Sequence, residues 1–320
     1  MAGALLAAAV VVLGAWVRLT DAGLGCPDWP GCYGHVYPNA GHSDAAAGFG
    51  KALHEMIHRY FAGTLVLTIA ILLAWAVLFR KDRDQPLIAV VMLFVIVCLQ
   101  GALGALTVTL LLKPLIVTAH LIGGLTTLGI LWWLSLTPPP RPSTQREPAL
   151  RKFALVGLAA LLLQIALGGW TSTNYAAVAC PDFPTCQHSW WPQMDFRDAF
   201  VLWHGLKMDY EGGVLANPAR VAIHLTHRLG ALVAGSILLS LGAAAVLSAT
   251  GVAGRRLAWA GGLLLFAVAL QISIGVATVH WGFPLPLATL HNAGAAFLVV
   301  SLVTVLRALW PASSIRMVPL

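Results

Sequence analysis

The sequence predicts an all-α polytopic membrane protein with eight transmembrane helices. Of the 320 residues, 59% are hydrophobic and only 10% are charged, whereas a soluble domain has about 25% charged residues. The mean hydropathy is +0.82. A net charge of +7 therefore does not indicate nucleic-acid binding, but predicts unequal basic charge on the two sides of a membrane.

The apolar residues gather into eight runs, each near the length of about 20 residues that crosses a bilayer. The first run has no basic start and no clear A-x-A cleavage site, so we expect a retained helix rather than a signal peptide. The eight runs cover residues 2–19, 54–79, 87–110, 115–136, 152–170, 220–248, 256–280 and 286–309.

The distribution of Lys and Arg predicts the orientation. With eight spans, the side that holds both termini would carry eleven Lys and Arg residues against three acids, and the other side eight against nine. Cytoplasmic loops carry the excess of basic residues. We therefore expect both termini in the cytoplasm and the long loops, about 20–53 and 171–219, on the outer side.

The chain is predicted to be a tandem repeat of two four-helix bundles in the same direction. The motif CPDWPGC at residues 26–32 recurs as CPDFPTC at 180–186. The offset grows by 15 between this motif and the histidines described below, which places an insertion within 196–217. A proline-rich stretch at 137–151 indicates a cytoplasmic linker. The predicted N-terminal half is 1–136, and the predicted C-terminal half is 152–320.

Four histidines recur in register, and each lies near the outer end of a predicted helix. They are His58 and His120 in the first half and His227 and His291 in the second. Ionisable groups inside a membrane are costly and usually functional, and imidazoles from facing helices suit a six-coordinate heme iron. We therefore expect two imidazoles per half to bind heme iron, ahead of a purely structural hydrogen-bonding role.

Further polar residues accompany the histidines. Arg59 and Arg228 each follow a candidate ligand, where a guanidinium suits a heme propionate or an interfacial arginine. Gln100 and Gln271 recur with the same offset as His120 and His291. For both we expect interhelical hydrogen bonds, with a part in heme packing as the alternative.

Glu55 has no acidic counterpart, because His224 stands at its position in the second half. It lies one helical turn before His58, where a carboxylate shielded from water suits a general acid or base. The residues 54–58 also match H-E-x-x-H, the zinc protease motif. The second half keeps the equivalent of His58 but not of His54, so we expect heme rather than zinc.

The cysteines predict two disulfides, Cys26–Cys32 and Cys180–Cys186, in loops on the outer side, where the compartment permits them. For Cys180–Cys186 we expect loop bracing. For Cys26–Cys32, which shares a half with Glu55, a redox role stays open.

With these residues in view, the chain resembles the heme A synthase family in its bacterial form. The resemblance rests on E-x-x-H-R at 55–59, the other three histidines, and GAWVRLTDAGLGCPDWPGC at 14–32. It covers nearly the whole chain.

The resemblance implies oxidation of a methyl group of heme O to the formyl group of heme A, by successive hydroxylations, for cytochrome oxidase. It assigns heme b to His227 and His291, with Arg228 beside it, and the substrate heme to His58 and His120, with Arg59 beside it. It matches Glu55 to the family's essential glutamate, and Cys26 and Cys32 to its first-loop pair.

The resemblance further implies a bacterial plasma (inner) membrane with the long loops on the periplasmic side. It implies heme O synthase and an electron acceptor such as a quinone as partners, and leaves a homo-oligomer open. The main alternative is a diheme b-type electron-transfer subunit, which the four histidines fit equally well. A zinc protease is the third interpretation and a transporter the fourth.

Overall fold

The computed structural model describes residues 1–38, 46–80, 86–136, 147–205, 208–248 and 251–310. These residues form eight helices that are long and apolar enough to cross a membrane, so the predicted multi-pass helical class is confirmed. The long helices are α1 (Ala2–Leu19), α2 (Ala46–Leu78), α3 (Leu87–Thr109), α4 (Pro114–Ser135), α5 (Glu147–Thr173), α7 (Asn217–Leu247), α8 (Gly251–His280) and α9 (Leu285–Leu309); η2 (Ala177–Ala179) and α6 (Phe196–Ala199) are short.

Several helix boundaries differ from the prediction, and the start of α2 differs most. The helix α2 begins at Ala46 rather than at residue 54. The prediction missed its first two turns because they lie outside the apolar run. Of the predicted linker 137–151, residues 137–146 lie outside the described residues, and 147–151 already belong to α5. Pro148 did not mark a break, because proline in a first turn leaves no intrahelical hydrogen bond unmade.

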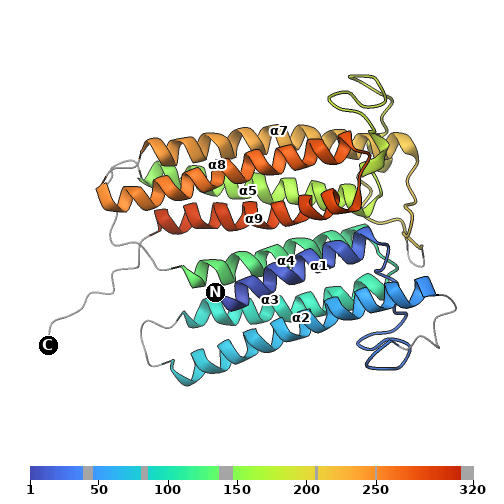
Figure 1. Ribbon diagram of the computed structural model, residues 1–320, viewed down its shortest axis with the longest axis horizontal. Helices are drawn as coiled ribbons and strands as arrows, with labels where there is room; N and C mark the ends of the chain where they lie inside the picture. The colour runs from blue at the N-terminus through green and yellow to red at the C-terminus, as the bar shows by residue number, and fades with distance from the viewer. Residues whose placement is uncertain (39–45, 81–85, 137–146, 206–207, 249–250, 311–320) are drawn as a thin grey trace.

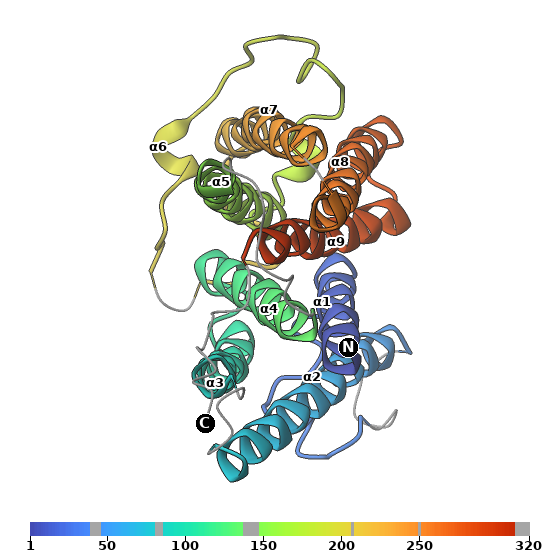
Figure 2. The same ribbon diagram turned by 90° about the vertical axis from the view of Figure 1, so that its left-hand side faces the viewer.

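The long helices form two sets of four that lie side by side (Figure 1). In the N-terminal set α1 packs on α2 and α4, and α3 packs on the same two helices. In the C-terminal set α5 packs on α7 and α9, and α8 packs on the same two. The end view in Figure 2 shows each set as a closed bundle.

Three helix pairs join the two sets: α1 with α9, α4 with α5, and α4 with α9. Buried aliphatic side chains from both sets form one continuous core across this contact. Within it, Trp132 on α4 donates a hydrogen bond from Nε1 to Oγ1 of Thr304 on α9, at 2.9 Å. Large apolar side chains on the outer faces of α2, α3 and α8 are exposed, as expected for helices surrounded by lipid.

The segment predicted to carry the insertion, 196–217, reaches from the C-terminal set to the N-terminal set. Lys113, before α4, is only 2% exposed; its Nζ lies 3.1 Å from the ring centroid of Trp203 and donates to the carbonyl of Gly205 at 2.7 Å. Tyr210 donates its backbone N–H to the carbonyl of Leu111. These contacts tie the loops of the two sets together at one end of the bundle.

The packing of α7 on α8 predicts that alanine substitution lowers the stability at one of two adjacent glycines and not at the other. A Cβ added to Gly261 would lie 2.7 Å from the carbonyl oxygen of Gly242, whereas a Cβ on Gly262 would meet no atom within 4 Å. Gly261→Ala should lower the free energy of unfolding by about 1–3 kcal/mol, as overpacking does. Thermal unfolding in detergent, with Gly262→Ala as the matched control, measures this. Equal melting temperatures for the two variants would contradict the close approach.

Candidate functional site

The four histidines lie on four different helices, two in each set. His58 is on α2 and His120 on α4; His227 is on α7 and His291 on α9. His58 and His120 are close enough to interact electrostatically, and so are His227 and His291. The structure therefore places together the two histidines that the sequence predicted as partners within each half.

Each imidazole rests against a glycine on the preceding long helix. A Cβ added to Gly14, Gly168 or Gly275 would lie 3.0, 3.1 or 3.0 Å from Cε1 of His58, His227 or His291, respectively. At Gly104 the same atom would lie 3.6 Å from Cε1 of His120. Glycine at these positions lets the ring approach the neighbouring helix backbone.

The nitrogen partners of the rings differ between the sets. In the N-terminal set, Nδ1 of His58 and Nδ1 of His120 are buried without a hydrogen-bond partner. In the C-terminal set, the side-chain amides of Gln164 and Gln271 lie beside the rings of His227 and His291. Paired imidazoles with buried nitrogens are a donor set that suits a heme iron.

Glu55 and Arg59 anchor the first cysteine loop to α2. The Glu55 carboxylate, only 4% exposed, accepts a hydrogen bond from the backbone N–H of Cys26 at 2.9 Å and one from Nη2 of Arg59 at 2.5 Å. Nη1 of Arg59 donates to the carbonyls of Asp28 and Gly31. A contact of Arg59 with a propionate stays a prediction.

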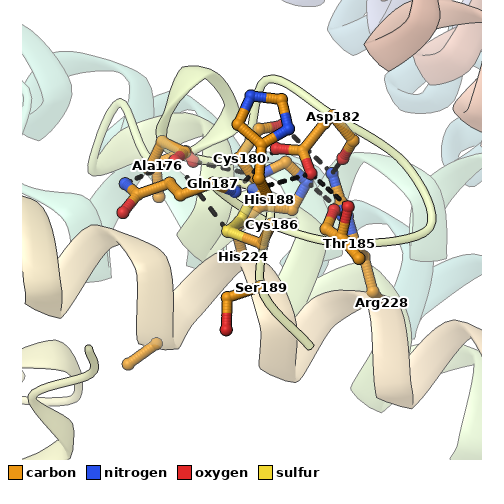
Figure 3. Close-up of a disulfide and its surroundings, with 12 residues drawn as sticks. Ala176, Cys180, Asp182, Thr185, Cys186, Gln187, His188, Ser189, His224 and Arg228 are labelled. Carbon is orange, nitrogen blue, oxygen red and sulfur yellow. Dashed lines mark hydrogen bonds between the residues drawn. A yellow bond between two sulfur atoms is a disulfide. The ribbon is translucent and has the colours of Figure 1, made fainter. Parts of the chain in front are cut away.

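The second loop is anchored in the same way, but without a carboxylate (Figure 3). Nε of Arg228 donates to Nε2 of His224 at 3.2 Å, and Nδ1 of His224 lies 3.2 Å from the carbonyl of Ala176. The guanidinium of Arg228 donates to the carbonyls of Cys180, Asp182 and Thr185. On the anchoring helix, Glu55 of the N-terminal set is thus replaced by His224 in the C-terminal set.

Both predicted disulfides are present, with Cα–Cα distances of 4.8 Å for Cys26–Cys32 and 4.6 Å for Cys180–Cys186. All four cysteines are fully buried. Each bridge closes its loop beside the N-terminal part of the following long helix, α2 or α7.

In each cysteine loop an aspartate side chain accepts hydrogen bonds from backbone N–H groups of the same loop. The sequence analysis did not predict this role. Asp28 accepts backbone N–H bonds from Tyr33 at 2.6 Å and Gly34 at 2.8 Å, and these bonds, that from Gly34 foremost, hold its pKa below the usual 3.8. At Asp182, burial acts to raise the pKa, but hydrogen bonds from Thr185, His188 and Gln187 lower it overall. The signal was available, because the aspartate recurs in both C-P-D motifs.

Gln164 was also missed, for a different reason. The offset of 154 that relates the cysteine motifs leads from Gln164 to Val10, so Gln164 did not appear as a repeated residue. Its place beside His227 follows only from the packing of α5 against α7.

His54, the first residue of the H-E-x-x-H match, packs edge-on against the ring of Trp16, with centroids 6.1 Å apart. Among the residues that the structure describes, no three His, Cys, Asp or Glu side chains converge as metal ligands. The expectation of no zinc stays a prediction.

The fold and the site define a multi-pass helical membrane protein with two histidine pairs and two disulfide-closed loops. Residues 1–303 match the family described as "Cytochrome oxidase assembly protein" (COX15-CtaA), and the chain belongs to this family. It is 41% identical to heme A synthase of Shewanella oneidensis over 95% of this chain and 94% of that protein. It is 27% identical to heme A synthase of Halalkalibacterium halodurans over 92% and 90% of the two chains.

The hydrogen bonds of Asp28 predict how the first loop responds to pH. Because the pKa is lowered in the folded protein, the stabilisation is present at neutral pH and is lost as the pH falls through that value, below 3.8. Reduction of Cys26–Cys32 by a phosphine should therefore stay slow down to about pH 4 and accelerate below it.

Asp28→Asn should accelerate reduction of this disulfide at pH 7 and remove the acid-dependent rise. Asp182→Asn is the matched control, because it should act on Cys180–Cys186 alone. Thiol alkylation with peptide mass spectrometry follows both bridges. An unchanged rate for Cys26–Cys32 in Asp28→Asn would contradict the role of this carboxylate.

Proposed function

We propose that the chain is a heme A synthase, which oxidises a methyl group of heme O to the formyl group of heme A for cytochrome oxidase. Membership of the cytochrome oxidase assembly family and the names of two relatives aligned over nearly their full length support this activity. One observation in the chain itself carries the proposal. Two pairs of neighbouring imidazoles are present, and among the described residues a buried carboxylate accompanies the first pair alone.

We infer that the two sets are the halves of a tandem repeat with divided roles. The same order of packing in both sets and the same anchoring of both cysteine loops support a common origin. In this account the half 1–136 takes the substrate heme O between His58 and His120. The half 152–320 holds a heme b cofactor between His227 and His291.

The residues fit such groups. Imidazole is a common axial ligand of heme iron, and the rings of His58 and His120 are buried with Nδ1 atoms that have no side-chain partner. A bound heme supplies one-electron chemistry, and the protein supplies ligands, orientation and a proton donor or acceptor. Arg59 and Arg228 lie one residue after a ligand and are candidates for contact with the propionates.

Glu55 is proposed as the general acid or base of the successive hydroxylations. It sits on α2 three residues before His58, so both face the same side of the helix. The backbone N–H of Cys26 and the guanidinium of Arg59 fix its position. Because Glu55 binds the loop directly, the Cys26–Cys32 disulfide is placed to influence it, and a catalytic role for these cysteines is part of the proposal.

The distribution of basic residues supports an orientation with both termini in the cytoplasm of a bacterial inner membrane and the cysteine loops on the periplasmic side. The loops and the four histidine-bearing helix ends lie at the same end of the bundle, consistent with chemistry near the outer surface. Heme O synthase as the supplier of substrate and a quinone as electron acceptor are the proposed partners.

Heme extraction and chromatography test the activity. The protein is purified from cells with and without a heme O synthase. Heme b alone without it, and heme A in addition with it, is the expected result. Two heme b per chain in both cases, with no heme A, would contradict the proposal and favour a diheme electron-transfer subunit.

Glu55→Gln should abolish heme A formation while heme remains bound. General acid–base catalysis contributes about 10²–10⁴-fold, so heme O should accumulate in place of heme A by at least about 100-fold. His54→Ala is the matched control and should retain turnover, because this residue is not assigned a heme contact. Normal heme A formation in Glu55→Gln would contradict the role of this carboxylate.

A further inference from the structure

Side-chain amides contact two of the four histidines, both in the C-terminal set. Nε2 of Gln164 lies 3.0 Å from Nδ1 of His227 and donates to the carbonyl of the same residue at 3.0 Å. Nε2 of Gln271 lies 3.4 Å from Nδ1 of His291 and donates to its carbonyl at 3.1 Å. Each amide therefore touches both the ring and the backbone of one histidine.

The same sequence arrangement surrounds these contacts. Gln164 and Gln271 each precede by four residues the glycine against which the imidazole rests. Gln100 has this spacing to Gly104, beside His120. The first hairpin is the exception, because Val10 stands four residues before Gly14, opposite His58.

A second glycine makes room for each amide. It follows the histidine by three residues, at Gly123, Gly230 and Gly294. A Cβ added at any of these three would collide with the neighbouring glutamine side chain. At the fourth histidine this residue is Phe61. The glutamine and the glycine are thus both present at three histidines and both absent at His58.

The amides are suited to an iron-bound imidazole. A ring that binds iron through Nε2 carries its proton on Nδ1 and needs an acceptor there, which fixes its orientation and raises its basicity. Oε1 of Gln100, Gln164 and Gln271 is buried without a hydrogen-bond partner. Because the two ends of an amide differ little in shape, a reversed amide presents this oxygen to Nδ1, in exchange for the bond that Nε2 now donates to the histidine carbonyl.

We propose that Gln164 and Gln271 are positioning residues that keep His227 and His291 as lasting heme ligands, and that His58, which lacks such an amide, is the ligand that releases the substrate heme. The proposal rests on the proposed function and deepens it. A cofactor heme must stay through many turnovers, whereas heme O must enter and heme A must leave. The second half has amides on both ligands, and the first half has one amide only, at Gln100.

The reduction potential of the cofactor heme separates positioning from packing. Gln164→Leu and Gln271→Leu remove the acceptor, make the imidazole less basic and should raise the potential; Gln164→Glu retains an acceptor and should lower it. Gln100→Leu is the matched control and should leave this potential unchanged. Spectroelectrochemistry of the purified full chain follows the heme b signal. Shifts of the same sign in Gln164→Leu and Gln164→Glu would overturn the proposal.

Heme release supplies a second measurement. In protein made with heme O synthase, chromatography separates heme b from hemes O and A, and apomyoglobin serves as the acceptor of released heme. Gln164→Leu and Gln271→Leu should release heme b at least about 10-fold faster, the usual effect of removing a partner of a ligand. Gln100→Leu should accelerate release of hemes O and A alone.

The converse variant transfers the amide to His58. Val10→Gln with Phe61→Gly should slow release of hemes O and A by about 10-fold. Val10→Leu with Phe61→Gly is the matched control, because it opens the same space without an amide. Equal release rates for these two double variants would overturn the assignment of His58.

A ligand variant distinguishes failure of this proposal from failure of the proposed function. His227→Ala should lose heme b; if it retains heme b, the proposed ligand set is wrong. If His227→Ala loses heme b while Gln164→Leu and Gln271→Leu match the wild-type protein in potential and release, only the positioning role is wrong.

Discussion

The site depends on the close approach of an imidazole to a glycine backbone, made once in each of four helical hairpins. At three of these contacts a Cβ on the glycine would lie 3.0–3.1 Å from Cε1 of the ring, so any other residue there would require the ring to shift by a few tenths of an ångström. The ring in turn sits on the helix that follows, which fixes how each pair of helices packs. Because α1 and α3 each pack on both α2 and α4, and α5 and α8 each pack on both α7 and α9, these four contacts place the histidines as two pairs.

The two halves share this frame and differ in the polar residues placed on it. Arg59 and Arg228 bind the carbonyls of equivalent loops, so loop anchoring is common to both. Glu55 binds the first loop, whereas His224 occupies the same place in the second. In the first half a carboxylate makes this contact, and in the second half an imidazole makes it. In the proposed function, this difference and the uneven distribution of amides assign the reaction to the first half and the cofactor to the second.

The eight spans, both disulfides and the pairing of the histidines followed from the sequence, because apolar run length and residues in register report directly on them. The true starts of α2 and α5 did not, because Gly50 and Lys51 interrupt the apolar run at the start of α2, and charged residues do so at the start of α5. The bonds of Arg59 to the loop and of Gln164 to His227 were missed because they join residues far apart in sequence. The contact of Lys113 with Trp203 spans both halves, and an internal repeat carries no information about contacts between its copies.

The central claim is that His227 and His291 hold a heme while Glu55 acts in the other half. Cryo-electron microscopy of the full chain, purified from cells that lack heme O synthase, tests it most directly. The account predicts porphyrin density between α7 and α9, with the iron bound by Nε2 of His227 and of His291. Density for a single zinc ion at His54 and His58, or a bundle in which α7 and α9 enclose no porphyrin, would contradict it.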